Sequence, residues 1–459
     1  MGKVFTALFV GSALFLAYFV TKYSDVHTEL PPTRDEYYGP GPPRADNGKI
    51  DDFQISVADN VLVDLKNRLK ATKFYKPLEN VEWQYGINAN YMRTVHRHWL
   101  DTYDWAKFQR VLNNYPHYRT ELEGLSVHFI HAKPPPGRYK RVIPLLLVHG
   151  WPGSVWEFHK ILPLLSDPHQ ALKPQGVPED VAFEVVAPSI PGYAWSDKPS
   201  KTGFGPIAAA RIFGKLMKRL GHEKYYCQGG DWGSLITTIM AQMYPERILG
   251  LHVNMAYVSI HNYPILFVQT LLGTVVPWVG VPPEDESKLY PLGQRFMDLL
   301  QETGYMHIQA TKPDTVAFAL NDSPMGLAAY ILEKFSTWTN MAYRSLPDGG
   351  LSRHWTLDEL LTNVMIYWTT DSIVSSQRFY KECFKHPDYA TFEKAAVHVP
   401  SGFSVFPHEL VRTPESHLAY KFKNITYYRD MPRGGHFPAF EEPKLLANEI
   451  FTFVASLEA

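Results

Sequence analysis

The sequence predicts an α/β fold in which a mostly parallel, doubly wound sheet lies between layers of helices. A continuous apolar run, clearest at 143–148 (IPLLLV), is typical of a strand buried on both faces of a parallel sheet. Such runs alternate along the chain with helical patterns such as 234–243, the order expected of strand–helix–strand units. The alternation fails between 257 and 361, where helix formers accumulate. We therefore expect a helical lid above the carboxyl ends of the strands, where open α/β sheets bind ligands.

The remaining elements follow from local patterns. Apolar residues recur at helical spacing over 57–70, and a second helical region, rich in aromatic residues, covers 90–112. The clearest helix of the lid is 327–335. Further strands are expected at 125–129, 183–187, 225–228, 249–255, 395–399 and 424–428.

The composition excludes some classes of protein. The 459 residues carry a formal net charge of −1, which argues against an extended basic surface for nucleic acid. Cys227 and Cys383 are the only cysteines and cannot form a disulfide framework, so a reducing environment is expected for the folded body, with Cys227 a buried core thiol. We interpret the pair His96 and His98 as surface or packing residues, not metal ligands.

The N-terminus carries an uncharged apolar run at 4–20, with Lys3 before it and Lys22 after it. At ~1.5 Å per residue the run spans about 25 Å, slightly less than the ~30 Å hydrocarbon core of a bilayer. A cleaved signal peptide is the competing interpretation, but no small-x-small cleavage site follows Val20. We therefore expect an uncleaved membrane anchor, whose orientation is poorly fixed because positive charge lies on both sides.

These patterns divide the chain into six expected parts. They are a transmembrane anchor (1–23), a linker rich in Pro and Gly (24–50), an N-terminal helical wrapping region (51–140), the first part of the core (141–256), the helical lid (257–362) and the second part of the core (363–459).

The stretch from Gly229 to Gly233 (GGDWG) carries the most chemical information. It has the form small-x-nucleophile-x-small of the strained elbow between a strand and a helix, with Asp231 where many hydrolases carry Ser. A carboxylate is already ionised near neutral pH and needs no base before it attacks. That suits attack on sp3 carbon, as in an epoxide or an alkyl halide. The alternative is an ordinary β-turn containing Asp.

A second turn supports the elbow. His149 to Ser154 (HGWPGS) follows the strand at 143–148 and has the form HGxP, which places a backbone N–H beside the nucleophile. The backbone N–H groups of Trp151 and Trp232 are the expected oxyanion hole. Taken alone, the segment is equally well explained as a simple strand-to-loop turn.

An acid and then a base should follow the nucleophile along the chain. His436 (RGGHF) comes after the last expected strand and is the candidate base, while its nearest rival, His417, lies before that strand in an expected helix. The acid should lie in the loop after the penultimate strand. Glu409 lies there, with Glu415 and Asp388 as alternatives.

The motifs GGDWGS, HGWPGS, SSQRFYKE, GYMHIQATKPDT, NDSPMGLAAYILEKFSTWTN and RGGHFPAFEEP resemble those of the microsomal epoxide hydrolases, most closely the arthropod juvenile hormone epoxide hydrolases. The resemblance covers nearly the whole chain and implies an α/β-hydrolase fold. It places the nucleophile at Asp231, the acid at Glu409, the base at His436 and two lid phenols at Tyr305 and Tyr380. At one position the chain departs from the pattern: Asp371 stands where glycine is expected.

The resemblance implies an enzyme that converts lipophilic epoxides, juvenile hormone or xenobiotic compounds, to vicinal diols with water and without metal or organic cofactor. It also implies a single-pass protein of the endoplasmic reticulum (microsomal) membrane, in contact with lipid through its N-terminal helix and with its catalytic body facing the cytosol. No nucleic-acid partner is expected.

Two rival functions remain open. A haloalkane dehalogenase shares the Asp elbow and the ester, but needs halide-binding N–H groups where Tyr305 and Tyr380 offer phenols. A catalytically inactive hydrolase fold that serves as a membrane-tethered binding protein would lack a nucleophile or base, whereas Asp231, Glu409 and His436 are all present. A serine esterase is excluded because the chain contains no G-x-S-x-G.

Overall fold

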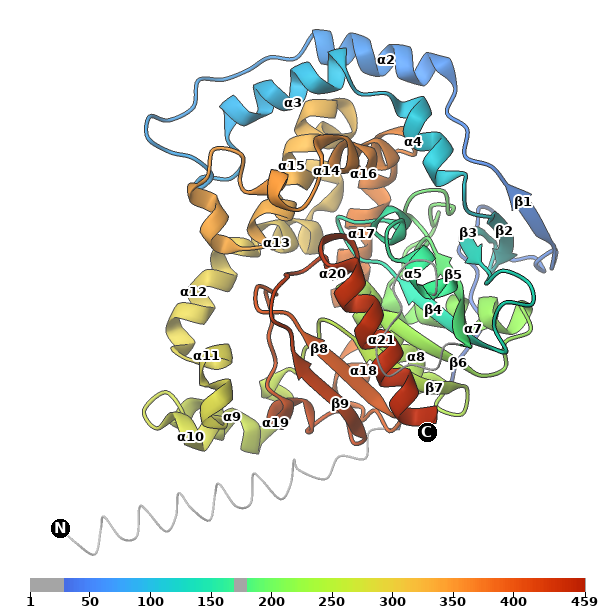
Figure 1. Cartoon of the computed structure of the whole chain (residues 1–459), viewed down its shortest axis with the longest axis vertical. Coiled ribbons are helices and arrows are strands. Elements are labelled where there is room, and N and C mark those ends of the chain that lie inside the picture. The colour runs from blue at the N-terminus through green and yellow to red at the C-terminus, as the bar shows by residue number, and fades with distance from the viewer. Residues whose placement is uncertain (1–28, 169–179, 459) are drawn as a thin grey trace, which may run out of the picture.

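The computed structural model describes residues 29–168 and 180–458. Its centre is a nine-stranded sheet in the order β1-β2-β3-β5-β4-β6-β7-β8-β9 (Figure 1). The strands are β1 (Ile50–Phe53), β2 (His117–Leu122), β3 (Leu125–Ala132), β4 (Arg141–Val148), β5 (Val181–Pro188), β6 (Tyr225–Gly229), β7 (Ile248–Val253), β8 (Ser401–Val405) and β9 (Ile425–Asp430).

The sheet has an antiparallel and a parallel half. β1, β2 and β3 pair antiparallel with one another, and β3 continues antiparallel onto β5. From β5 to β9 all neighbours are parallel. The expected doubly wound sheet is therefore confirmed for its central and C-terminal strands, and the N-terminal region adds three strands to it. Strand β4 is buried over its second half, as its apolar run predicts.

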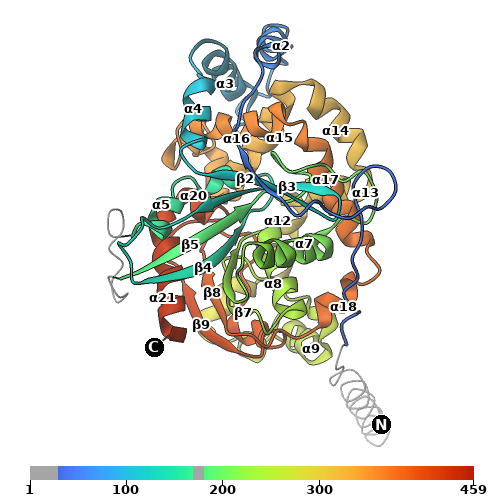
Figure 2. The same ribbon diagram turned by 90° about the vertical axis from the view of Figure 1, so that its right-hand side faces the viewer.

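Helices cover both faces of the sheet. On one face α7 (Pro206–Arg219) packs on α8 (Trp232–Met243), which contacts β4, β6 and β7. On the other face α21 (Pro443–Glu458) contacts α5 (Leu162–Ser166), β7 and β8. Figure 2 shows the sheet between these two layers. The core is therefore a three-layer sandwich whose strand ends remain free for the site.

The helices between β7 and β8 form the lid. They are α9 (Pro264–Leu272), α10 (Pro277–Gly280), α11 (Glu286–Leu289), α12 (Leu292–Glu302), α13 (Gly304–Thr311), α14 (Pro313–Asp322), α15 (Pro324–Thr337), α16 (Leu357–Thr369), α17 (Ser372–Lys385) and α18 (Tyr389–Lys394). Helix α17 packs on α13 and α14, and α15 packs on α16. In Figure 1, α13 to α16 lie above the sheet, while α9 to α12 run down beside it.

The N-terminal helices lie over this lid. They are α2 (Asp59–Lys70), α3 (Ala89–Asp101) and α4 (Trp105–Leu112), and they contact α15 and α16 (Figure 1). The two remaining α-helices are α19 (Glu415–Leu418) and α20 (Pro438–Glu441). Five 3₁₀ helices complete the described elements: η1 (Val155–Phe158), η2 (Ile260–Asn262), η3 (Pro283–Asp285), η4 (Met341–Ser345) and η5 (Leu351–Arg353). The N-terminal region thus braces the lid from outside.

One expected strand is wrong. Residues 395–399 form no strand; Val397 makes a single bridge to Phe422, and the strand begins at Ser401. Ala395, Val397 and Val399 alternate in the sequence and are buried, so they give a strand-like pattern without a ladder partner. The true strand, SGFSV, contains glycine because Gly402 lies against the ring of Phe453, where a Cβ would be 2.5 Å from a ring atom.

The described residues contain no helix long and apolar enough to cross a membrane. The anchor expected at 1–23, with its apolar run at 4–20, and the first residues of the linker lie outside the described residues.

Candidate active site

Asp231 lies on a strained turn between β6 and α8. Its backbone adopts φ 50° and ψ −126°, a conformation that L-residues rarely adopt. This turn lifts the side chain above the carboxyl end of β6 and sets it at the N-terminus of α8, where backbone N–H groups lack acceptors within the helix. The geometry is that of the expected elbow rather than an ordinary β-turn.

Glycines allow the elbow to close. A Cβ on Gly233 would lie 2.0 Å from the carbonyl oxygen of Val148, so the first turn of α8 presses directly on the end of β4. A Cβ on Gly150 would lie 2.3 Å from the Cβ of Asp231. The nucleophile and the turn after β4 therefore approach each other only because both positions lack side chains.

The turn after β4 supplies a hydrogen-bond donor to the nucleophile. The backbone N–H of Trp151 donates to Oδ1 of Asp231 at 2.7 Å. Trp232, the second expected donor, is the first residue of α8. Helix α16 holds this turn, since Asn363 donates to the carbonyl of Pro152 at 2.7 Å and the hydroxyl of Tyr367 donates to that of Gly153 at 2.6 Å. Sequence reasoning missed both α16 residues.

His436 lies between two carboxylates. Its Nδ1 is 2.7 Å from Oε1 of Glu409, and its Nε2 is 3.4 Å from Oδ2 of Asp231. Glu409 follows β8, and His436 follows β9, as the chain order requires. Both side chains are almost fully buried. The structure thus brings together the three residues that the sequence singled out for nucleophile, acid and base.

The rival candidates lie elsewhere. His417 is in α19 and its Nε2 contacts the carbonyl of Gly280 at 3.1 Å. Glu415 is exposed at the start of the same helix, and Asp388 precedes α18. His96 contacts the carbonyl of Leu69, so it is a packing residue in the N-terminal region.

The carboxylates govern the charge of His436. Burial alone would lower its pKa, but Glu409 and Asp231 outweigh burial and raise the pKa of His436 well above its ordinary value. The two carboxylates therefore favour the protonated, positively charged ring in the resting site.

Two phenols enter the site from the lid. Tyr305 is on α13, and its ring stacks on that of Trp151 with centroids 5.1 Å apart. Tyr380 is on α17, with its ring 5.8 Å from that of Tyr305 and 4.6 Å from that of Trp232. Burial and the nearby Asp231 raise the pKa of both tyrosines well above the ordinary value, so both remain proton donors. Within the described part of the chain, the buried Tyr380 hydroxyl makes no hydrogen bond of normal geometry.

A small cavity lies beneath the nucleophile. The centre of a water molecule can occupy a volume of about 20 Å³ inside this cavity. The lining includes Asp231, His436, Asn254 and Glu157. That volume suits one water. Nδ2 of Asn254 is buried without a hydrogen-bond partner among the described residues, so it is available to a water there. Nε2 of His436, 3.4 Å from Oδ2 of Asp231, makes no hydrogen bond of normal geometry and can also face that water.

Two buried glutamates near the site were not predicted. Burial raises the pKa of Glu157, in η1, to about 8. Burial likewise raises the pKa of Glu441, in α20, to about 8, although its carboxylate accepts from the backbone N–H groups of Gly435 and Phe437. No motif marks either residue in the sequence. Glu441 holds the loop that carries His436, and Glu157 faces the cavity.

Asp371 adopts the conformation that explains why glycine was expected there. It precedes α17 with φ 49° and ψ 32°, in the left-handed region. Aspartate tolerates this region better than most residues. Helix α17 and its Tyr380 therefore keep their place without glycine at the junction.

Comparison with known proteins agrees with this geometry. Residues 50–158 match the family described as "Epoxide hydrolase N terminus", and residues 143–402 match "alpha/beta hydrolase fold". "Epoxide hydrolase 1" of Oryctolagus cuniculus is 49% identical over 435 residues, which cover 93% of this chain and 94% of the relative. The chain belongs to the epoxide hydrolase family. "Juvenile hormone epoxide hydrolase 1" of Ctenocephalides felis is 43% identical, with 94% and 92% of the two chains covered.

Solved structures of epoxide hydrolases share the fold. The crystal structure of juvenile hormone epoxide hydrolase from Bombyx mori is 40% identical, has a TM-score of 0.85, and is matched over 92% of this chain and 98% of that chain. The Aspergillus niger epoxide hydrolase is 28% identical, with a TM-score of 0.71 and the same coverage. The resemblance stated from the motifs is confirmed, and this epoxide hydrolase has the α/β-hydrolase fold with a mostly parallel sheet.

Proposed function

We propose that this epoxide hydrolase opens lipophilic epoxides in two steps, through an ester on Asp231 that is hydrolysed by water activated by His436. The observation that carries the proposal is the position of His436. Its ring joins Glu409 to Asp231 and borders a cavity with room for one water.

In the first step Asp231 attacks the less hindered carbon of the oxirane ring. Oδ1 is held by the N–H of Trp151, which leaves Oδ2 as the attacking atom. Tyr305 and Tyr380 donate hydrogen bonds to the oxirane oxygen and stabilise its developing negative charge. Their raised pKa values suit this role, because a donor must still carry its proton.

In the second step water attacks the ester carbonyl. Alkylation removes the charge of Asp231, one of the two carboxylates that raise the pKa of His436, so the pKa of His436 falls when the ester forms. Its proton passes to the alkoxide formed in the first step, and the neutral ring that remains is the base of the second step. Oδ1 becomes the tetrahedral oxyanion at the N–H groups of Trp151 and Trp232, a stabilisation of typically ~3 kcal/mol per donor.

The two steps are separated by replacing the base. In His436→Gln, alkylation should proceed and hydrolysis should stall, so mass spectrometry of the variant with substrate should show the added mass on the Asp231 peptide. Asp231→Asn should show none. His408→Gln, which removes a histidine outside the site, should turn over substrate without accumulating adduct. An unmodified Asp231 peptide in folded His436→Gln would exclude the covalent scheme.

The substrate class has two candidates. A terpenoid epoxide like juvenile hormone is supported by the relatives of that name in Ctenocephalides felis and Bombyx mori. A broader range of xenobiotic epoxides is supported by the higher identity to "Epoxide hydrolase 1" of Oryctolagus cuniculus. The ratio of kcat/KM for a terpenoid epoxide and a small aryl epoxide decides between them. Release of halide from a chloroalkane would instead support the dehalogenase alternative.

We also propose attachment to the endoplasmic reticulum membrane through 4–20, with the catalytic body in the cytosol and lipid as a partner. Large apolar side chains in the lid support contact with lipid, because Leu272, Val275 and Trp278 are all more than half exposed. Removal of residues 1–28 should transfer the protein from the membrane fraction to the supernatant at high salt. Equal membrane retention with and without those residues would contradict the anchor.

A further inference from the structure

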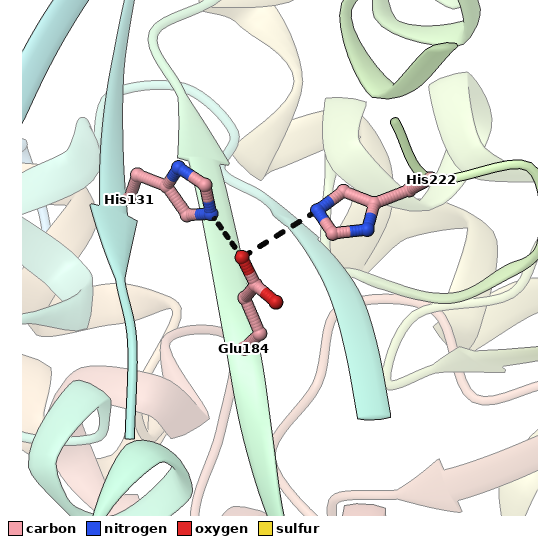
Figure 3. A group of neighbouring side chains, drawn as sticks. All are labelled: His131, Glu184 and His222. Carbon is pink, nitrogen blue, oxygen red and sulfur yellow. Dashed lines mark hydrogen bonds and ion pairs between the residues drawn. The ribbon is translucent and has the colours of Figure 1, made fainter. Parts of the chain in front are cut away.

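Outside the catalytic site, three side chains converge on one carboxylate oxygen. His131 comes from β3, Glu184 from β5, and His222 from the turn that follows α7 (Figure 3). Nε2 of His131 is 2.7 Å from Oε1 of Glu184, and Nε2 of His222 is 3.7 Å from the same oxygen. Among the described residues this is the group whose ligand atoms all lie within 4.8 Å of one another.

The strand register explains the convergence. The Cα of His131 pairs with that of Val186, two residues from Glu184 on β5. Side chains two residues apart on a strand share one face, so His131 and Glu184 are diagonal neighbours within reach of each other. His222 reaches the same face from outside the sheet (Figure 3).

We propose that His131, Glu184 and His222 form a binding site for a divalent transition metal, with zinc the best match. Two imidazoles and one carboxylate are a ligand set that suits zinc, with water as the fourth ligand. Bonds of about 2.0–2.1 Å in a tetrahedron place ligand atoms about 3.3 Å apart. The separations of 2.7 and 3.7 Å lie on either side of that value, so small side-chain rotations complete the geometry.

His222 provides an independent reason for a ligand. Its Nε2 is buried and has no hydrogen-bond partner among the described residues, although it points at Glu184. A buried polar atom without a partner costs free energy, and a bound metal ion would remove that cost by accepting the nitrogen lone pair.

Two features of the site must change when a metal binds. Nε2 of His131 donates to Glu184, because a carboxylate only accepts, so that hydrogen must leave Nε2 for the metal to take its place. Lys133 lies 3.5 Å from Oε1 of Glu184 and competes with a cation. Its side chain is 65% exposed, so it can turn into solvent.

A metal here would join parts of the fold that are distant in sequence. It would tie β3 to β5 and both to the turn that leads into β6, the strand before the nucleophile. None of the three ligands lines the catalytic cavity. The expected effect is therefore on stability, with diol formation unchanged.

The test uses the full chain, without an affinity tag, purified in detergent and stripped with a chelator. Zn²⁺ should bind with one-to-one stoichiometry at this site and raise the melting temperature, and Co²⁺ should give the visible absorption of a four-coordinate site. His131→Gln and His222→Gln should each weaken binding by about 100-fold or more, since loss of even an outer-shell partner costs 10–100-fold. His307→Gln, an exposed histidine on α13, should leave binding unchanged.

Lys133→Gln is a variant expected to strengthen metal binding, and it removes none of the three ligands. It should tighten Zn²⁺ binding, because the competing cation is gone, and its exposed position keeps the fold intact. Equal Zn²⁺ affinity and equal thermal shift in wild type, His222→Gln and Lys133→Gln would overturn the proposal, as would a Co²⁺ spectrum unchanged by His222→Gln.

Discussion

The two lid phenols give the sharpest kinetic prediction. Tyr305 and Tyr380 are on different helices, α13 and α17, and meet above Asp231 with their rings 5.8 Å apart. Phenylalanine removes only the hydroxyl at either position and keeps the ring contacts with Trp151 and Trp232. The substitutions Tyr305→Phe and Tyr380→Phe therefore remove a donor without emptying the space it occupied.

The expected loss follows from what a donor to a developing oxyanion contributes. Removal of one such donor in a site closed to water costs about 2.7–4 kcal/mol, or roughly 10²–10³ in rate. Alkylation should slow by that factor in each single variant and by more in the double variant. Hydrolysis of the ester should change by less than about tenfold, since its oxyanion forms at backbone N–H groups instead.

Single-turnover stopped-flow fluorescence measures both steps. Trp151 stacks on Tyr305, and Trp232 lies 4.6 Å from Tyr380, so ester formation and decay should change their emission. Tyr330→Phe is the matched control, because this phenol also packs against Trp151 but donates to Gln309 instead. Equal slowing of alkylation and hydrolysis in Tyr305→Phe, or an alkylation rate equal to that of the control, would refute the assigned role.

Four further predictions follow from the site and the lid junction. Glu409→Gln should lower kcat for diol formation by roughly 10³–10⁴, since the ring of His436 loses the carboxylate that orients it; a loss under tenfold would contradict this. In wild type, kcat should fall as the pH decreases through the pKa of His436 in the ester intermediate, because a protonated ring cannot act as a base. A kcat that stays constant below neutral pH would exclude His436 as the base. Burial raises the pKa of Glu157 to about 8 in the native state, whereas in the unfolded chain the pKa is the ordinary 4.5. Between these two pH values the unfolded chain has released a proton that the native state still binds. The free energy of unfolding therefore falls by about 1.4 kcal/mol per pH unit from pH 4.5 to about pH 8. Glu157→Gln should therefore stabilise more near pH 7.5 than near pH 5 in urea denaturation, and an equal effect would show that Glu157 is ionised. Asp371→Gly should raise the free energy of unfolding by up to about 1 kcal/mol by relieving its left-handed backbone, as urea denaturation would show; a loss of stability would mean that the Asp371 side chain makes a contribution of its own.

The sequence predicts strands best where burial on both faces leaves a continuous apolar run. Residues 143–148 are such a run, and they lie within β4. The prediction failed at 395–399, where alternating apolar residues are buried without pairing to a neighbouring strand. It also missed Ser401–Val405, whose Gly402 fits close packing against Phe453 of α21. An alternating apolar pattern indicates that side chains are buried, but a strand also requires hydrogen bonds to a neighbouring strand.

For the site, chain order and local turn chemistry were sufficient to select Asp231 and His436. Chain order left Glu409 as one of three possible acids, and the family resemblance selected it; in the structure its Oε1 lies 2.7 Å from Nδ1 of His436. Tyr305 and Tyr380 could be selected only through family resemblance, because they are 75 positions apart and lie in an insertion without a local signature. Glu157 and Asn254 have no signal in the sequence, since their relevance depends only on the cavity they share with the nucleophile.

The raised pKa of His436 determines where protons come from and go to during one turnover. The resting site stores one proton between two carboxylates. Ring opening creates an alkoxide that needs one proton, and ester hydrolysis takes one proton from water. When the stored proton passes to the alkoxide and a proton from water replaces it on His436, one turnover exchanges no net proton with the solvent. The rate of such a cycle would be independent of the concentration of external buffer.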